Sequence, residues 1–320
     1  MMAIHLSSGL SQQTEINYMS KLGEYIALKL NHVFPTLTIH NNLEVAKRNI
    51  TENQKWAYDE IKRIVTAFEP YWNLREKNIL DIGTGLGGKL PYYIESGAKS
   101  VIGVDINLQN LRAAYDHIRA SGLSSVIQLV QCDAARLPFP DNSFDSIISI
   151  NVFEHIEKVD YAVREAYRVI KPGGLALLHL PPYYSAWGPH LENWIHFPWP
   201  HLLFSEKTLM RVAAIEDRKK HLNDQFIESA RIDWQHNNNR IPGINHVTLQ
   251  HFHQMVLKSG FFILQLKLLP TGYDFLNSSN SVYKKLLLQI LIQATNIPIL
   301  QEVIVTKMVY VLQKRLQEIN

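Results

Sequence analysis

Short apolar runs alternate with stretches of helical periodicity between residues 78 and 181. The apolar runs cover residues 78–82, 101–106, 126–132, 144–152 and 175–181, and residues 108–120 and 161–170 repeat apolar positions at helical spacing. Runs such as Ser146-Ile-Ile-Ser-Ile150 are nearly continuous in apolar character, which is typical of parallel strands covered on both faces. The pattern predicts a doubly wound α/β domain with a Rossmann-like sheet.

Helical periodicity also precedes this domain. Residues 1–50 carry a weak helical pattern that Pro35 interrupts, and Thr51 is a candidate N-cap for a helix that continues to Phe68 and ends before Pro70. We therefore expect residues 1–70 to form an N-terminal helical cap. The apolar positions of these two helices are Tyr18, Leu22, Tyr25, Ile26 and Leu30, and then Trp56, Ile61, Ile64, Val65 and Phe68.

The alternation stops after residue 181. Residues 182–247 are rich in aromatic, proline and histidine residues and are expected to form a substrate-binding lid, helical over 203–240. Residues 247–259 and 281–294 predict helices, and residues 261–269 and 302–313 predict strands. The expected domains are the cap at 1–70, a cofactor-binding core at 71–181, the lid insertion at 182–247 and the C-terminal part of the core at 248–320.

The composition excludes several classes of protein. A hydrophobic content of 46% indicates a packed globular chain, and a net charge of +3 from 32 basic and 29 acidic residues gives no basic tract for nucleic acid. The single cysteine, Cys132, excludes a disulfide framework and a cysteine-based zinc site. Because no apolar run reaches 18 residues and the N-terminus lacks a signal pattern, we expect a cytoplasmic protein without stable membrane insertion.

A glycine-rich turn follows the first apolar run. Gly83, Gly85 and Gly88 match the G-x-G-x-x-G spacing, at which glycine allows positive φ and a close approach of backbone N–H groups to a ligand. This spacing alone fits any Rossmann-type nucleotide site. Asp81, two residues earlier, favours a cationic ligand group, whereas a dehydrogenase would present helix N–H groups to phosphates.

Polar residues also end the other predicted strands. Asp105 ends the second apolar run, where a carboxylate commonly accepts both ribose hydroxyls. Asp133 follows the third run and is placed to accept a hydrogen bond from the amine of adenine, and Asn151 ends the fourth. These residues predict a nucleoside-type cofactor at the carboxyl edge of the sheet.

Six ordered motifs run through this region. They are Ile79-Leu-Asp-Ile-Gly-Thr-Gly-Leu-Gly87, Gly103-Val-Asp105, Cys132-Asp-Ala134, Leu137-Pro-Phe-Pro-Asp-Asn-Ser-Phe-Asp145, Glu154-His-Ile156 and Arg168-Val-Ile-Lys-Pro-Gly-Gly174. Together they resemble class I S-adenosylmethionine-dependent methyltransferases, especially the small-molecule, methyltransferase type 11-like branch that includes quinone, sugar and natural-product enzymes. The resemblance implies a seven-stranded sheet with an antiparallel last strand, with N-terminal helices and a helical lid.

The same resemblance implies a cofactor, S-adenosyl-L-methionine, which leaves as S-adenosyl-L-homocysteine. Asp81 and the glycine loop would hold its methionine part, Asp105 its ribose, and Ile106 and Asp133 its adenine. The expected cofactor-binding residues are Asp81, Gly83, Thr84, Gly85, Gly87, Asp105, Ile106, Cys132, Asp133, Ala134 and Asn151.

Histidine and aromatic residues supply candidates for the acceptor side. A general base helps when the acceptor is a hydroxyl, and His190 and then His155 are the candidates for it. The segment after the fifth strand is expected to wall an amphipathic acceptor, although its aromatic residues could equally pin the loop by packing. The expected substrate-binding residues are Tyr183, Tyr184, Trp187, Glu192, Trp194, His196, Trp199 and His201.

Other ligands are less favoured. The histidines of this segment have loop spacing and not the i, i+4 spacing of a helical metal pair, so no metal is expected. Pro181-Pro-Tyr183 resembles part of an Asn-Pro-Pro-Tyr motif, but the place after the fourth strand reads Asn151-Val-Phe-Glu, so nucleic acid is not the expected substrate. The apolar stretch 282–293 fits a core or dimer helix, with membrane-surface contact or capture of a lipophilic substrate as alternatives.

The sequence therefore predicts a methyltransferase that acts on a small or medium organic molecule, most simply by O-methylation of a natural-product hydroxyl. C-methylation of a quinone- or sterol-like acceptor, N-methylation, aminopropyl transfer and a non-catalytic cofactor-binding protein stay open, as does a homodimer. Intact Asp81, Gly83, Gly85 and Asp105 favour a chain that binds cofactor.

Overall fold

A computed structural model describes residues 12–34, 49–68, 72–220, 241 and 243–316. Pro35, Pro70 and the latter part of the predicted lid helix lie outside these residues. The chain divides into two compact units, one of residues 1–40 and 189–242 and one of residues 41–188 and 243–320. Each unit is described by itself.

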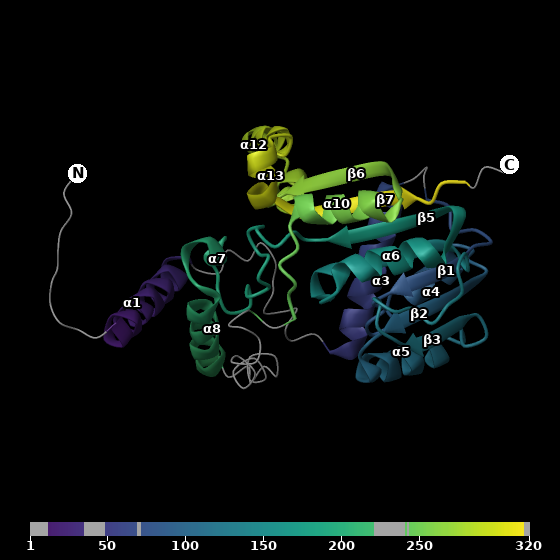
Figure 1. Cartoon of the computed structure of the whole chain (residues 1–320), viewed down its shortest axis with the longest axis horizontal. Coiled ribbons are helices and arrows are strands. Elements are labelled where there is room, and N and C mark those ends of the chain that lie inside the picture. Colours follow the sequence, from purple (N-terminus) through teal and green to yellow (C-terminus); the bar gives the residue numbers. More distant parts are fainter. Residues whose placement is uncertain (1–11, 35–48, 69–71, 221–240, 242, 317–320) are drawn as a thin grey trace. The chain divides into compact units, whose positions relative to one another are not determined.

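The larger unit is built on a seven-stranded sheet (Figure 1). Its strands are β1 (Asn78–Ile82), β2 (Ser100–Asp105), β3 (Ile127–Gln131), β4 (Phe144–Ile150), β5 (Ile170–Leu180), β6 (Phe262–Pro270) and β7 (Val305–Gln313), in the order β3-β2-β1-β4-β5-β7-β6. The first five strands pair in parallel, and β7 pairs antiparallel with both β5 and β6. The predicted Rossmann-like sheet with an antiparallel last strand is confirmed.

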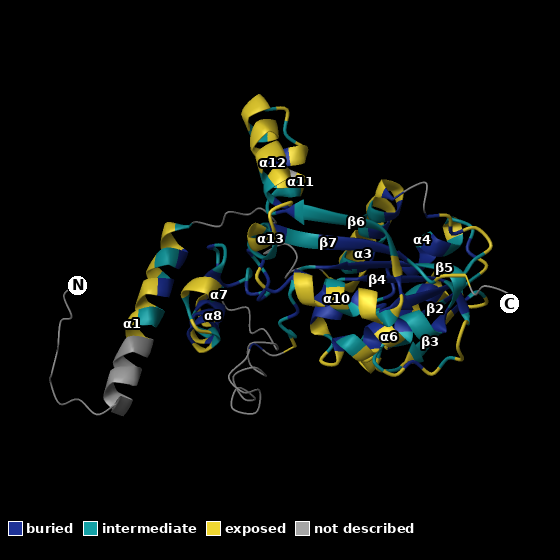
Figure 2. Ribbon diagram, turned by 45° about the horizontal axis from the view of Figure 1, so that its top comes forward, coloured by how far each residue is buried: buried dark blue, intermediate teal, exposed yellow. Residues whose placement is uncertain are grey.

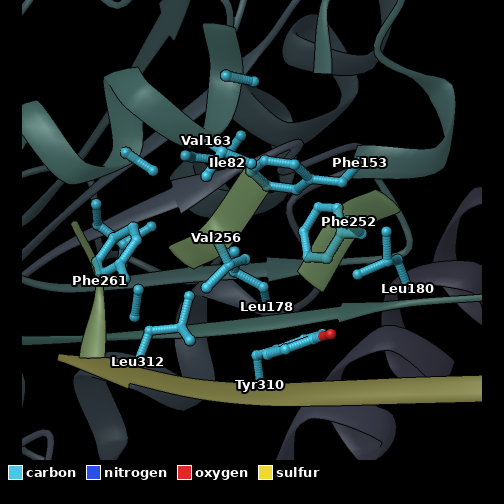
Figure 3. Close-up of a cluster of buried hydrophobic side chains, with 14 of the residues drawn as sticks. Ile82, Phe153, Val163, Leu178, Leu180, Phe252, Val256, Phe261, Tyr310 and Leu312 are labelled. Carbon is cyan, nitrogen blue, oxygen red and sulfur yellow. The ribbon is translucent and has the colours of Figure 1, made fainter. Parts of the chain in front are cut away.

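Helices cover both faces of this sheet because neighbouring strand residues point to opposite sides. Leu80 and Ile147 pack in one buried cluster with α6 (Val159–Val169) and α10 (Leu249–Ser259), which Figure 3 shows in close-up. Ile79 and Ile148 pack in a second cluster with α3 (Ile50–Ala67), α4 (Leu90–Glu95) and α5 (Leu108–Ala120). The near-continuous apolar strands thus reflect burial on both faces, as predicted.

The start of α3 differs from the prediction. Asn49, and not Thr51, is the N-cap: its side chain accepts from the Glu52 N–H, and the Glu52 carboxylate accepts from the Asn49 N–H, both at 2.9 Å. This reciprocal capping box satisfies two N–H groups that the first turn leaves unpaired, which a threonine inside the helix does not do. Ile61 and Val65 are buried as expected, but Trp56 is 39% exposed and lies off the apolar face.

The C-terminal part of the larger unit also departs from the prediction. The apolar pattern predicts one strand over residues 302–313, but α13 (Pro298–Ile304) occupies the first of them and β7 begins at Val305. Pro298 stands in the first turn of α13, where its missing N–H costs no hydrogen bond. With α11 (Tyr273–Asn277) and the predicted α12 (Val282–Ala294), α13 forms a helical insertion between β6 and β7.

The smaller unit consists of α1 (Gln12–Val33), α7 (Pro200–Leu203), α8 (Glu206–Lys220) and the segment that leads into α7. Asn31 ties α1 to that segment, because its side chain donates to the Trp194 carbonyl at 2.8 Å and accepts from the His196 N–H at 2.7 Å. Trp194 is buried and its indole N–H donates to Asp217 on α8 at 3.1 Å. These bonds close the unit around Trp194.

Candidate cofactor and active site

The glycine loop between β1 and α4 has the backbone that its sequence predicts. Gly83, Gly85 and Gly87 have φ values of 72°, 56° and 78°, a region that other residues rarely adopt. A Cβ on Gly83 would lie 2.2 Å from the Val152 side chain, so this position needs glycine for space as well. A Cβ on Gly85 would meet no atom within 4 Å, so the loop is open on that side. The loop can therefore receive a ligand against its backbone.

Asp81 lies beneath this loop and is fully buried. One carboxylate oxygen, Oδ1, accepts from the Tyr93 hydroxyl at 2.9 Å, and Oδ2 lies 3.5 Å from the ammonium of Lys89. Burial raises the pKa of the Asp81 carboxyl, and the Lys89 charge partly offsets this. Lys89 is itself buried and donates to the Gly83 carbonyl at 3.1 Å. Hydrogen bonds from Tyr93, Thr84 and Lys89 also lower the pKa of Asp81, but no donor among the described residues meets Oδ2 in a well-aligned hydrogen bond.

Asp105, at the end of β2, holds two neighbouring backbone segments. Its Oδ2 accepts from the Gly85 N–H and its Oδ1 from the Asn107 N–H, both at 2.8 Å. Each oxygen keeps a second lone pair for a ribose hydroxyl. Ile106 is next in the chain and is 69% exposed.

Asp133, after β3, has the geometry of a turn residue. Its Oδ1 accepts from the Ala135 N–H at 2.8 Å, which is the alternative that turn chemistry allows at this place. Its neighbour Cys132 is partly buried, and burial raises the pKa of its thiol to about 11, so the thiol is protonated at neutral pH. The predicted roles of Cys132, Asp133 and Ala134 at the adenine stay predictions.

Helix α3 contributes a wall of the site that the sequence patterns do not reveal. Gln54 donates to the Leu86 carbonyl at 2.9 Å, and a Cβ on Gly88 would lie 2.2 Å from the Gln54 carbonyl oxygen, so α3 packs directly on the glycine loop. A cavity of about 250 Å³ lies between them. It is lined by Asn53, Gln54, Trp56, Ala57, Glu60, Gly83, Thr84, Gly85, Leu86, Gly88, Lys89, Ile150 and Asn151.

Glu60 and Lys89 are the charged residues of this lining, and neither is among the predicted site residues. Burial raises the pKa of Glu60, while Lys89 and a hydrogen bond from Asn151 oppose the shift. A signal is present in the sequence, because Trp56 and Glu60 lie four residues apart and therefore share one face of α3, beside the apolar face. The sequence alone does not show that these two side chains face the glycine loop. The packing of α3 against the loop shows it.

The turn after β4 carries a second group of polar residues. Asn151 has a φ of 55°, and its N–H donates to the His179 carbonyl at 2.8 Å. Glu154 follows on the short 3-10 helix η1 (Phe153–His155) and is buried, and neither carboxylate oxygen has a hydrogen-bond partner within the described residues. Burial, and secondarily the charge of Glu60, raises the pKa of Glu154 to about 8.

His155 is held by the main chain through one ring nitrogen. Its Nδ1 lies 2.7 Å from the Gly243 carbonyl oxygen, and a carbonyl only accepts, so Nδ1 carries a proton. In the neutral ring the lone pair is then on Nε2, which lies 3.8 Å from Glu154 Oε1. The side chain is 45% exposed. This tautomer is the one that a proton-accepting Nε2 requires.

The predicted acceptor-binding residues fall in both units. Tyr183 is buried and stacks on His246 at a ring separation of 4.0 Å, and Tyr184 is 40% exposed, both in the larger unit together with Trp187. The smaller unit holds His190, Glu192, Trp194, His196, Trp199 and His201. Trp194 packs inside its own unit, against Asn31 and Asp217, and the roles of the others in acceptor binding stay predictions.

A larger cavity, of about 390 Å³, lies among α10, β6 and α13. Its lining includes Leu249, His253, Leu268 and Glu302 and none of the predicted cofactor residues. The candidate site is therefore identified by the glycine loop and its buried carboxylate, because the larger of the two cavities lies elsewhere.

Comparison with known proteins agrees with this geometry. Residues 80–178 match a family model described as a methyltransferase domain. They form a class I methyltransferase domain. The match begins within β1 and ends within β5, so the domain includes the glycine loop, Asp105 and the Glu154–His155 turn but not α3.

Curated relatives match about 30% to 43% of the chain. A sterol 24-C-methyltransferase of Gibberella zeae is 35% identical over 97 residues, which are 30% of this chain and 26% of the relative. A methyltransferase of Streptomyces halstedii, GfsG, is 33% identical over 30% of this chain and 34% of its own. The chain thus spans about a quarter to a third of the length of these relatives.

A solved structure resembles more of the chain. An S-adenosylmethionine-dependent methyltransferase from Mesorhizobium loti aligns with 83% of this chain and 100% of its own, with a TM-score of 0.50 and 18% identity. At that identity the likeness concerns the fold around the methyltransferase domain. No helix among the described residues is long and apolar enough to cross a membrane.

Proposed function

We propose that this protein transfers a methyl group from S-adenosyl-L-methionine to a small organic acceptor. The observation that carries the proposal is the buried Asp81 carboxylate beneath an open glycine loop, with an oxygen that receives no well-aligned hydrogen bond from the described residues. A buried carboxylate is costly unless it is paired, and Lys89 at 3.5 Å supplies one charge for it. A ligand ammonium would supply the missing donor.

The other cofactor groups also find suited partners. The open side of Gly85 leaves room for the methionine part, and Asp105 keeps lone pairs for the ribose hydroxyls. Exposed Ile106 offers an apolar face for the adenine. Glu60 in the cavity lining, and Asp81 buried beneath the loop, favour a ligand that carries an ammonium and a sulfonium over one that carries phosphates. When bound, the cofactor supplies an electrophilic methyl group.

The chain's own contribution is to orient the acceptor, exclude water and remove a proton. The exposed Nε2 side of His155 lies next to the turn after β4, and Nδ1 is fixed by the Gly243 carbonyl. A proton taken by Nε2 would lie beside the Glu154 carboxyl, 3.8 Å away. Because the pKa of that carboxyl is about 8, its ionised form, which would stabilise the imidazolium, becomes the main form only above about pH 8. This arrangement supports a hydroxyl acceptor and O-methylation with His155 as the base. His190 is the alternative base.

C-methylation is the second candidate. The sterol 24-C-methyltransferases among the relatives favour it. A similar N-methyltransferase of Rauvolfia serpentina makes an amine a third candidate acceptor. A carbon acceptor needs an apolar pocket and a stabilised cation, and buried Glu154 and partly buried Glu60 would provide such stabilisation in their ionised forms. The acceptor atom therefore decides which residue is essential.

Two measurements test the proposal. Calorimetric titration with S-adenosyl-L-homocysteine should show binding to the wild type and a loss of at least about tenfold in affinity for Asp81→Asn, because the ammonium loses its charged partner. Transfer of a radiolabelled methyl group should then be screened over hydroxyl, amine and sterol-like acceptors. A wild type that binds neither S-adenosyl-L-methionine nor its product would refute the proposed function.

The base is tested separately on the acceptor found. His155→Gln should reduce kcat on a hydroxyl acceptor by about 10²-fold or more and leave binding of S-adenosyl-L-homocysteine unchanged. His251→Gln, on the exposed first turn of α10, is the control for loss of an imidazole. Full activity of His155→Gln would move the role to His190 or to a mechanism without a base.

A further inference from the structure

The helical insertion between β6 and β7 is not needed to connect these strands. The two strands pair antiparallel from Phe262↔Gln313 to Pro270↔Val305, and such strands can be joined by a turn of a few residues. Here the two ends of residues 271–304 lie next to each other at the end of the β6–β7 pair. The Thr271 N–H and hydroxyl both donate to the Ile304 carbonyl, at 2.8 and 3.0 Å. The insertion is thus a closed excursion from the sheet.

Most of this excursion exposes apolar side chains. Within α12 only Leu288 is buried, while Tyr283 is 85% exposed and Ile290 57% exposed. Figure 2 shows α12 as an exposed helix along most of its length. We name the following residues the apolar helix surface: Val282, Tyr283, Leu286, Leu287, Ile290, Ile292, Ile297, Ile299 and Leu300.

So many exposed apolar side chains within 19 residues are unusual for a surface that faces only water. Single exposed apolar residues are common, but a contiguous group marks a contact with another apolar phase or partner. On α12 the exposed apolar residues Val282, Leu286 and Ile290, and likewise Tyr283 and Leu287, recur four residues apart and therefore share one side of the helix. Buried Leu288 lies on the opposite side.

The charge of the segment favours an anionic partner. The insertion, residues 271–304, contains two lysines, Lys284 and Lys285, and two acidic residues near its ends, Asp274 and Glu302. Asp274 pairs with Lys307 at 2.7 Å, and Glu302 accepts from two backbone N–H groups at the start of α10. Both lysines lie in the first turn of α12, next to exposed Tyr283. An aromatic residue and lysines at one end of an apolar helix match the order of a lipid bilayer, where such side chains occupy the headgroup level above the acyl chains.

The length of α12 limits how it meets a bilayer. It has 13 residues, and a helix needs about 20 to cross the hydrocarbon core. It can therefore enter only the boundary between headgroups and acyl chains. We propose that the apolar helix surface docks the protein on membranes that contain anionic lipids, through burial of α12 and α13 side chains and attraction of Lys284 and Lys285 to the headgroups.

Co-sedimentation of the full chain with lipid vesicles tests this. Binding to vesicles of phosphatidylcholine with phosphatidylglycerol should exceed binding to phosphatidylcholine alone by about tenfold or more at low ionic strength, since each basic residue near an anionic surface contributes to affinity. Lys284→Gln with Lys285→Gln should remove this difference. Equal binding of the wild type to both kinds of vesicle would overturn the anionic preference.

Leu287→Asp tests the apolar part, with Leu257→Asp on α10 as the matched control. Both leucines are 47% exposed, so the two substitutions add the same charge at the same accessibility. We expect Leu287→Asp to reduce vesicle binding by about tenfold or more and Leu257→Asp to leave it unchanged. Circular dichroism and S-adenosyl-L-homocysteine binding check that each variant is folded.

Two results would assign the surface to another occupant. A wild type that is a dimer in analytical ultracentrifugation, becomes monomeric as Leu287→Asp and binds no vesicles would make the surface an interface with a second copy. A monomeric wild type that binds no vesicles would show that the chain itself covers the surface. Either result overturns membrane docking and leaves the proposed methyl transfer unaffected.

Discussion

The Lys89 ammonium lies 3.5 Å from Oδ2 of Asp81, and both side chains are buried beneath the glycine loop. The two residues come from opposite ends of the loop, β1 and the start of α4. Their pairing places two opposite charges beneath the loop. Among the residues that the structure describes, no donor forms a well-aligned hydrogen bond to Oδ2. Asp81 therefore bears on the stability of the loop and, in the proposed function, on cofactor binding.

Replacing Lys89 by methionine should destabilise the fold. Lys89→Met leaves the buried Asp81 carboxylate without its charged neighbour, and breaking a buried pair in this way typically costs about 3–5 kcal/mol. Urea unfolding followed by circular dichroism measures the change. The double variant Asp81→Asn with Lys89→Met should recover part of the loss, because no unpaired charge is left, and a double variant less stable than both single ones would contradict this account.

Asp105→Ala should weaken cofactor binding more than it weakens the fold. The substitution removes the acceptor for the Gly85 and Asn107 N–H groups and the partner of the ribose hydroxyls. We expect the affinity for S-adenosyl-L-homocysteine to fall by about tenfold or more, from the loss of charge-assisted hydrogen bonds. Asp116→Ala, an exposed carboxylate on α5, is the control and should bind as the wild type does. An unchanged affinity in Asp105→Ala would rule out its role at the ribose.

Gly88→Ala should separate α3 from the glycine loop. Its Cβ would lie 2.2 Å from the Gln54 carbonyl, a backbone atom that cannot move without the helix. We expect a loss of about 1–3 kcal/mol in the free energy of unfolding and weaker cofactor binding, because overpacking forces the backbone to shift. Gly23→Ala on α1 would meet Thr208 at an ordinary 3.7 Å and is the control. Equal stability of both variants would show that α3 is not tightly packed on the loop.

The stability of the larger unit should fall as pH rises towards 8. Burial raises the pKa of Glu154 from 4.5 to about 8, so the folded chain holds a proton that the unfolded chain releases in this range. The stabilisation is complete below pH 4.5 and is lost as pH rises through the folded pKa, with a slope of up to about 1.4 kcal/mol per pH unit.

Glu154→Gln tests this, because an amide does not titrate. Urea unfolding between about pH 5 and 8 should give a smaller slope for the variant than for the wild type, and the two curves should diverge towards high pH. Glu157→Gln, a carboxylate three residues further along the chain, is the control. Parallel curves for wild type and Glu154→Gln would mean that the Glu154 carboxyl ionises normally in the folded chain.

Local patterns are sufficient for the elements that depend on neighbours in the chain. The apolar runs predict the parallel strands because both faces of the sheet are covered, and the glycine spacing predicts positive φ at Gly83 and Gly85 because those turns allow few other residues. The boundaries are less accurate. Asn49 and not Thr51 is the N-cap because Asn49 exchanges bonds with Glu52, whereas Gln54, which would complete a box with Thr51, donates to the Leu86 carbonyl instead.

By itself, then, the sequence determined a Rossmann-like sheet, a glycine loop and the strand-end carboxylates Asp81 and Asp105, since each follows from local geometry and strand direction. Only the tertiary structure decided that α3 walls the site with Trp56 and Glu60, and that Lys89 turns inward to Asp81. The physical reason is that these contacts join residues whose side chains could face water equally well. Packing of α3 on the loop, at Gly88 and Gln54, removes that choice.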